Sequence, residues 1–167
     1  SNIKSSKMLD DYFKQDDIIK FLKEDLDRFR IFPLMSLDDN RWAAFNIESI
    51  AGYHPAKLSS YNRYLNQFSG NGKTMIPNKG ILKMLNVKYL IVTKSDLFRL
   101  GIVDGELKHP WFDIVKTGNI QVYKFKYFQE RVFLVDSLKT ILNKEKIYKN
   151  VFSEDYNPSN IAYVNEK

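Results

Sequence analysis

The chain has 167 residues, a hydrophobic fraction of 44%, an aromatic fraction of 14% and a formal net charge of +6 at pH 7. This length and composition suit one folded domain with a core of its own and exclude a disordered tail. There is no cysteine, which excludes disulfides and thiolate metal sites. The net charge favours acidic partners, but the basic residues are dispersed, so a solvated basic surface is the simpler interpretation.

The chain ends set the expected domain limits. No apolar stretch approaches the roughly 20 residues of a membrane-spanning helix, and no signal peptide is visible. Ser1 and Asn2 resemble a scar left by tag cleavage. We expect residues 1–15 to be a tag remnant and poorly ordered lead-in, and residues 16–167 to form a single domain cut from a larger protein.

The first predicted element is an amphipathic helix over Asp17–Arg28, because apolar residues recur there at helical spacing. Asp16 or Asp17 is expected to cap it. A first strand follows over Arg30–Leu34, and an irregular segment leads to a helix over Ala56–Phe68. The next stretch, Gly80–Thr93, predicts a short apolar helical turn and a break at Asn86.

The run Val87–Val92 is apolar except for Lys88, which is typical of a strand covered on both faces. Downstream, Phe112–Val115 and Ile120–Phe125 predict a hairpin. A strand over Arg131–Val135 and a helix over Leu138–Tyr148, capped by Asp136 or Ser137, are expected next, and then a short strand over Ile161–Val164. The predicted fold is therefore α/β: a single domain with a mixed sheet of about five strands, Val87–Val92 central, and helices on both faces.

Catalytic patterns are scarce. The two histidines, His54 and His109, each precede a proline in a turn, where a structural or exposed histidine is commoner than a catalytic base. Asp38 and Asp39 lack further ligands at a useful spacing, so a solvated turn is favoured over a metal. The glycine-rich loop Ser69–Thr74 lacks the spacing and the preceding strand of a phosphate loop. We expect no cofactor, no metal and no catalytic residue.

One cluster of polar and aromatic residues surrounds the irregular loop that leads into the second helix. Rings combined with hydrogen-bonding groups suit a sugar or a sugar phosphate, while the simpler alternative is that the tyrosines pack the loop and the lysine is solvated. The candidate contact residues are Arg41, Asn46, Tyr53, His54, Lys57, Tyr61 and Arg63.

The same loop carries a family resemblance. Two segments, NRWAAFNIESIAGYHPAKLSSYNRYL at Asn40–Leu65 and ILKMLNVKYLIV at Ile81–Val92, resemble the extracytoplasmic region of YfhO-like bacterial membrane proteins. A weaker match continues over His109–Ser137, where Gln129 and Glu130 replace an expected proline. The resemblance covers about Phe29–Val164.

The resemblance implies a polytopic membrane protein of the glycosyltransferase C type, with this chain as a soluble extracytoplasmic accessory domain that is not catalytic by itself. Its partners would be the membrane part of the same polypeptide and a saccharide or lipid-phosphate sugar. The alternative is a structural or protein-interaction domain with no ligand of its own. Nucleic acid is not an expected partner, because no recognition motif is present.

Overall fold

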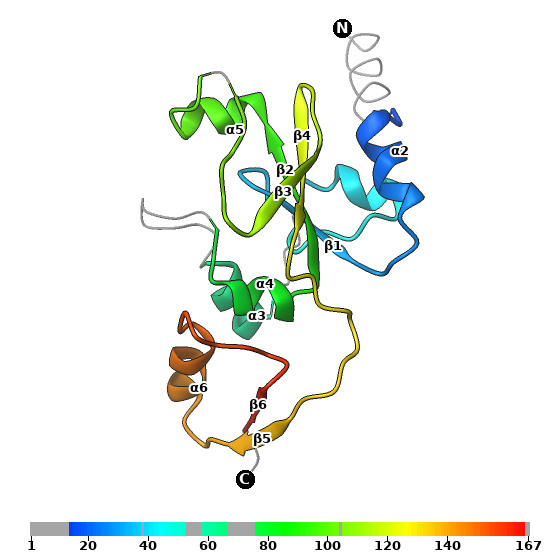
Figure 1. Cartoon of the computed structure of the whole chain (residues 1–167). Coiled ribbons are helices and arrows are strands. Elements are labelled where there is room, and N and C mark those ends of the chain that lie inside the picture. The colour runs from blue at the N-terminus through cyan, green and yellow to red at the C-terminus, as the bar shows by residue number, and fades with distance from the viewer. Residues whose placement is uncertain (1–13, 38, 53–57, 67–75, 104, 166–167) are drawn as a thin grey trace, which may run out of the picture.

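Strand β2 (Val87–Thr93) lies inside a four-stranded mixed sheet, as the sequence predicts. The strand order is β1-β2-β4-β3, with β1 parallel to β2 and β4 antiparallel to both of its neighbours (Figure 1). The other strands are β1 (Arg30–Pro33), β3 (Phe112–Lys116) and β4 (Ile120–Phe125). The computed structural model describes residues 14–37, 39–52, 58–66, 76–103 and 105–165.

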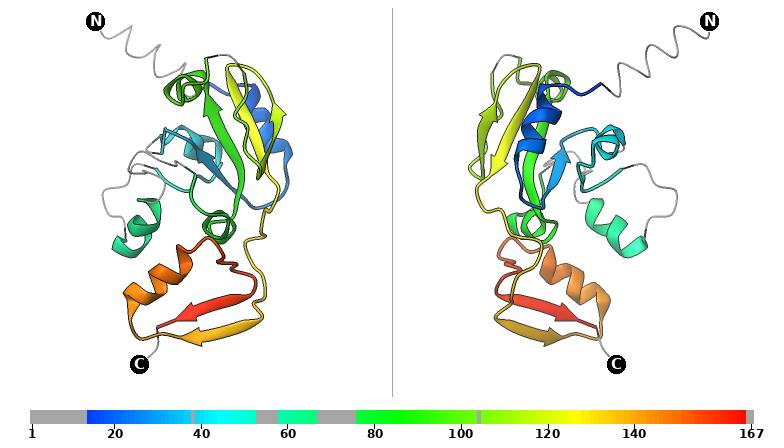
Figure 2. Two further views of the ribbon diagram at one scale, coloured as in Figure 1. Left: turned by 60° about the vertical axis from the view of Figure 1, so that its left-hand side comes forward. Right: turned by 90° about the vertical axis from the view of Figure 1, so that its right-hand side faces the viewer.

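Helices cover both faces of this sheet, which confirms the predicted α/β class. On one face, α2 (Asp17–Glu24) and the 3₁₀ helix η1 (Arg41–Phe45) pack on Tyr89, Ile91 and Val122 (Figure 2). On the other face, Leu90, Val92 and Tyr123 meet a larger cluster that draws side chains from four further helices. These are α3 (Ser59–Leu65), α4 (Lys79–Met84), α5 (Lys94–Arg99) and α6 (Lys144–Val151).

A β-bulge accounts for the position of Lys88, the charged residue of the central strand. Arg30 pairs with Val87 and Ile31 pairs with Tyr89, so Lys88 is an extra residue with no partner in the ladder. A bulge of this kind redirects a side chain without ending the strand. Lys88 thereby reaches the loop after α2 although it lies in an otherwise apolar run.

Helix α2 is capped as predicted but ends early. The Asp16 carboxylate accepts hydrogen bonds from the amides of Ile18 (3.1 Å) and Ile19 (2.9 Å). The predicted end at Arg28 is wrong, because Asp25 leaves the helical conformation and its carboxylate bonds Lys88 and Tyr89 of the sheet. Tertiary contacts therefore override the helical periodicity.

The region after the sheet differs most from expectation. The predicted strand Arg131–Val135 does not form. The predicted helix Leu138–Tyr148 is also wrong: β5 (Ser137–Thr140) pairs in parallel with β6 (Ile161–Val164) as a second, two-stranded sheet, and α6 follows. Asn143 caps α6 through the amides of Glu145 (2.9 Å) and Lys146 (3.3 Å), in place of Asp136 or Ser137. The predicted strand Ile161–Val164 is confirmed.

Most of the shorter elements agree with the sequence-based prediction. The hairpin of β3 and β4 is confirmed, and α4 ends in the predicted break at Asn86. Helix α5 was not expected; Thr93 and Asp96 form a capping box that starts it. Helix α3 lies within the predicted Ala56–Phe68, whose two ends fall outside the described residues, as do residues 1–13. Among the described residues, no helix combines the length and the apolar character needed to cross a bilayer.

Candidate functional site

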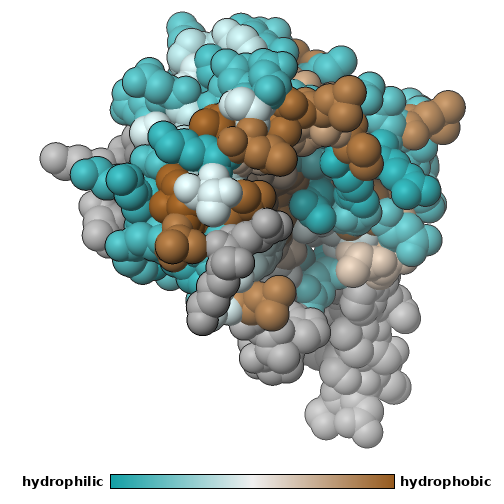
Figure 3. All heavy atoms as spheres, turned by 90° about the horizontal axis from the view of Figure 1, so that it is seen from below, coloured by the Kyte–Doolittle hydropathy of each residue, from teal (hydrophilic) through white to brown (hydrophobic). Residues whose placement is uncertain are grey.

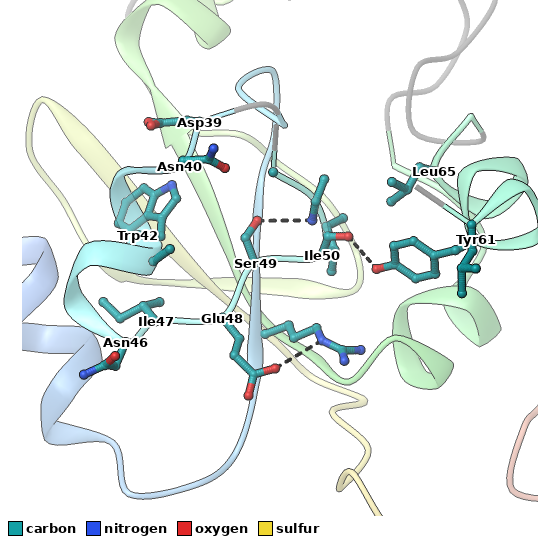
Figure 4. A pocket seen from close by; sticks show the side chains of 15 residues that line it. Asp39, Asn40, Trp42, Asn46, Ile47, Glu48, Ser49, Ile50, Tyr61 and Leu65 are labelled. Carbon is teal, nitrogen blue, oxygen red and sulfur yellow. Dashed lines mark hydrogen bonds and ion pairs between the residues drawn. The ribbon is translucent and has the colours of Figure 1, made fainter. Parts of the chain in front are cut away.

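A hollow of about 810 Å³ lies between β1, the η1 segment and α3 (Figure 4). Its size is within the roughly 300–1,000 Å³ range of small-molecule sites. It is built almost wholly from the segment that carries the first part of the family resemblance. The lining residues are Arg30, Asp39, Asn40, Trp42, Ala43, Asn46, Ile47, Glu48, Ser49, Ile50, Ala51, Gly52, Leu58, Tyr61 and Leu65.

The loop after η1 forms one wall because it runs beside β1 like a short extra strand. The Ile31 amide donates to the Glu48 carbonyl (2.8 Å), and the Ile50 amide donates to the Ile31 carbonyl (3.0 Å). Ser49 makes an isolated parallel bridge with Ile31. Polar Glu48 and Ser49 are thereby held between the buried side chains of Ile47 and Ile50.

Two further contacts fix the shape of the hollow. The Tyr61 hydroxyl donates to the Ile50 carbonyl (2.5 Å), which ties α3 to the wall, and burial raises the pKa of this phenol. Asn46 ends η1 in the left-handed region at a φ of 59°, a conformation that asparagine tolerates better than most residues. The hollow is therefore largely preformed by backbone hydrogen bonds.

The charged groups at the rim are paired with one another, two arginines with one carboxylate. Arg131 donates two hydrogen bonds to the Glu48 carboxylate (2.8 and 2.7 Å), and Arg30 lies 3.5 Å from the same carboxylate. The hydrogen bond from Arg131 is the main reason that the pKa of Glu48 is lowered. A paired carboxylate of this kind is a poor proton acceptor at neutral pH, so it does not resemble a general base.

The buried indole of Trp42 leaves one donor without a partner. Its Nε1 has no hydrogen-bond acceptor among the described residues. Figure 4 shows this nitrogen on the side of the ring nearest Asn40, at the edge of the hollow. Unpaired buried donors are rare in folded proteins, because each one costs about 1–3 kcal/mol.

The predicted contact residues divide into three groups. Asn46 and Tyr61 line the hollow. Arg41 does not line it: its guanidinium binds the Asp16 carboxylate (2.6 Å) and the Lys14 carbonyl (3.1 Å). Arg63 does not line it either.

The Arg63 guanidinium makes a two-pronged ion pair with Glu145 and lies 4.0 Å from the centre of the Tyr148 ring, so it connects α3 to α6. The hydrogen-bond donors of Arg63 are therefore directed at Glu145 of another helix and not at the hollow. The remaining candidates, Tyr53, His54 and Lys57, lie outside the described residues.

Sequence reasoning missed several lining residues, chiefly Arg30, Trp42, Glu48 and Ser49. A signal for two of them was available: Glu48 and Ser49 are a polar pair between two isoleucines, in a segment too irregular for a helix. Arg30 had no such signal, because it enters the wall only when β1 pairs with β2.

The second histidine has a structural environment. His109 Nδ1 accepts a hydrogen bond from the Trp111 amide (3.3 Å), and the imidazole meets the rings of Trp111 and Phe112 edge-on. Burial lowers its pKa. In the part of the chain that the structure describes, no group of three or more His, Cys, Asp or Glu side chains is arranged to hold a metal ion.

Comparisons with known proteins identify no relative: no family model, no curated protein and no solved structure matches this chain.

Proposed function

We propose that this chain is a non-catalytic accessory domain that binds a saccharide or a lipid-linked sugar in the hollow between η1 and α3. We further propose that it belongs to the extracytoplasmic face of a polytopic, glycosyltransferase-like membrane protein of the YfhO-like type. One observation supports the ligand proposal most directly. Most residues that line the hollow lie within Asn40–Leu65, the segment whose sequence resembles the YfhO-like proteins.

The lining has the chemistry that a sugar requires. A sugar presents hydroxyl groups, which both donate and accept hydrogen bonds, on a ring with apolar C–H faces. The lining includes Asn46 and the Ser49 hydroxyl as polar groups, and Ile47 and Ile50 as apolar ones. Few polar groups on an apolar base are the usual composition of a small-molecule site.

Binding without turnover fits the electrostatics of the rim. Glu48, a carboxylate of this wall, is held ionised by Arg131 and Arg30, which lower its pKa. Retaining and inverting glycosidases need two carboxyl groups with contrasting pKa values across the scissile bond. Of the two carboxylates in the described lining, Asp39 and Glu48, the second is bound by Arg131 and Arg30.

The alternative function is a structural or interaction domain without a ligand. That alternative predicts an exposed apolar patch and no concave pocket. A preformed hollow of about 810 Å³ favours the ligand-binding proposal for this part of the molecule.

The first prediction is that the ¹⁵N-labelled chain binds sugars through this hollow. Titration with methyl glycosides of neutral hexoses and N-acetylhexosamines, and separately with farnesyl phosphate, should shift the amide signals of residues 46–52 and 58–65. Ser49→Ala and Trp42→Phe each remove one donor, and each should weaken binding roughly three- to tenfold, the size of a lost neutral hydrogen bond.

Trp111→Phe is the matched control, because Trp111 does not line the hollow. Its affinity for the glycosides should equal that of the wild type. The absence of shifts in residues 46–52 and 58–65 for every glycoside and for farnesyl phosphate would refute the ligand proposal. Membership of a membrane protein is tested separately by the open reading frame that encodes the chain, which should contain many apolar spans.

A further inference from the structure

The segment after the main sheet exposes large apolar side chains at the lower end of the molecule. Val132 and Leu134 are 85% and 95% exposed, and Leu138 and Leu142 are each 69% exposed. Phe133 and Val135 between them are only partly buried. In this apolar run, exposed and partly buried side chains alternate, as they do in an extended segment that has one face in solvent. Seen from below, apolar residues lie open among hydrophilic ones (Figure 3).

Strand β5, in the middle of this segment, pairs along one edge with β6 and has no partner strand along its other edge among the described residues. The amides of Ser137 and Ile141 donate to the carbonyls of Asn160 (3.1 Å) and Val164 (2.9 Å), next to and in β6. Since alternate residues of a strand direct their amides to opposite edges, those of Leu138 and Thr140 face away from β6. Figure 2 shows β6 between β5 and the rest of the molecule, with β5 outermost.

The two-stranded parallel sheet of β5 and β6 is not packed against other elements on both faces, as parallel sheets usually are. Parallel sheets are almost always covered on both faces, and a two-stranded sheet alone is marginal in water. Yet all four residues of β5 are exposed. An added strand would satisfy the outward amides and cover part of the exposed apolar area.

The charges around the edge indicate the kind of partner. Lys139 on β5 and three lysines of the following helix α6 are exposed, and the structure shows no ion pair for them among the described residues. The acidic residue of the same helix, Glu145, is already paired with Arg63. A second copy of the chain would bring two Lys139 side chains to one edge, and lysine on an edge strand opposes such pairing. The α6 lysines are Lys144, Lys146 and Lys149.

We propose that the free edge of β5 binds an extended segment of a partner protein in which apolar and acidic residues alternate. The partner's backbone pairs with Leu138 and Thr140, its apolar side chains cover the exposed leucines, and its carboxylates meet the lysines. This is strand addition, in which backbone hydrogen bonds provide affinity and alternate side chains provide specificity. The proposal uses a surface separate from the hollow and does not depend on sugar binding.

The test uses a blocked synthetic peptide in which valine and glutamate alternate, and a second peptide in which valine and lysine alternate. The glutamate peptide should shift and protect the amides of Leu138 and Thr140 in the full ¹⁵N-labelled chain. Thr140→Pro removes the outward amide while sparing the hydrogen bonds to β6, and it should abolish these changes. Lys139→Glu should weaken the glutamate peptide roughly fivefold and strengthen the lysine peptide.

Several results would overturn the proposal. These are the absence of shifts on β5 at about 1 mM peptide, and binding that neither variant alters. Self-association of the peptide-free chain in sedimentation would assign the edge to a second copy. Binding to phosphatidylglycerol vesicles without a response to either peptide would assign the surface to a membrane. If Thr140→Pro fails to fold, the change in peptide affinity caused by Lys139→Glu is the deciding measurement.

Discussion

At the scale of single residues, the buried amine of Lys88 shows how the fold accommodates a charge in its core. Lys88 Nζ forms an ion pair with Asp25 and another with Asp27 (2.6 Å), and the Tyr89 hydroxyl donates to the same Asp25 oxygen (2.6 Å). The Phe128 ring lies 5.2 Å from the ammonium. Burial alone would lower the pKa of Lys88, but these carboxylates raise it, so the amine stays charged.

The second prediction is that Lys88→Met destabilises the chain by about 2–4 kcal/mol at pH 7, because it leaves the half-buried Asp25 without its cation. Burial raises the pKa of Asp25, but hydrogen bonds from Lys88 and Tyr89 outweigh it and hold the pKa below 3.8. A lowered folded pKa adds stability above about pH 4 that is lost as the pH falls through the folded value.

Urea unfolding from pH 2 to 7 measures both effects. The wild type should lose stability below about pH 4 more steeply than Lys88→Met, in which the Asp25 shift is reduced. The raised pKa of Lys88 acts only in the alkaline range, so it does not enter this window. Lys124→Met, at an exposed position of β4, is the control and should be nearly neutral. A Lys88→Met protein as stable as the wild type would contradict the prediction.

At the scale of elements, the junction between α4 and β2 depends on one asparagine. Asn86 adopts a φ of 57° and turns the chain from helix into strand. Its carbonyl accepts from the Arg30 amide (2.9 Å), which starts β1, and its side-chain amide donates to the Gln129 carbonyl (2.8 Å). A single left-handed residue thus orients three segments of the fold.

The third prediction compares two substitutions at this junction. Asn86→Gly loses the side-chain bond but keeps an unstrained backbone, and should cost about 1 kcal/mol. Asn86→Ala loses the same bond and strains the backbone as well, and should cost about 2–3 kcal/mol. Chemical denaturation of both variants measures the difference. Equal free energies of unfolding for the two variants would show that the left-handed backbone conformation at residue 86 does not affect stability.

At the scale of the whole molecule, helix α4 joins the main sheet to the part that contains α6 and β6. The Asn78 side-chain amide donates to the carbonyls of Val151 (3.2 Å) and Ser153 (3.0 Å). Gly80 lies so close to this part that a Cβ there would be 2.2 Å from the Tyr156 carbonyl oxygen. Together with the Arg63–Glu145 ion pair, these contacts fix the small sheet below the large one.

The fourth prediction is that Gly80→Ala destabilises the chain by about 2–3 kcal/mol, because the added methyl would overlap backbone atoms of Tyr156. Helix propensity alone predicts the opposite sign, a gain of about 0.5–1 kcal/mol. Thermal unfolding measures the sign. Ser60→Ala, at an exposed position of α3, is the matched helix control and should change stability by less than about 0.5 kcal/mol. A stabilised Gly80→Ala protein would refute the close packing of α4 on Tyr156.

The hollow overlaps the stretch that the sequence singled out, but only some of the predicted contact residues line it. An irregular stretch rich in rings and polar groups pointed to residues 41–63, and the hollow lies there. Asn46 and Tyr61 line it, whereas Arg41 and Arg63 are held by Asp16 and Glu145. Sequence spacing shows which side chains are close along the chain, but it does not show which distant carboxylate forms an ion pair with each arginine.

The sequence by itself determined the α/β class, the central place of β2, the hairpin, an aspartate cap at residue 16 or 17 and the break at Asn86, because periodicity, capping and turn chemistry are local. Only the tertiary structure decided the early end of α2, the strand β5 in place of a predicted helix and the charged rim of the hollow. Each of these rests on partners more than 20 residues away: Lys88 for Asp25, β6 for β5 and Arg131 for Glu48. Contacts of that range leave no periodic signal in the sequence.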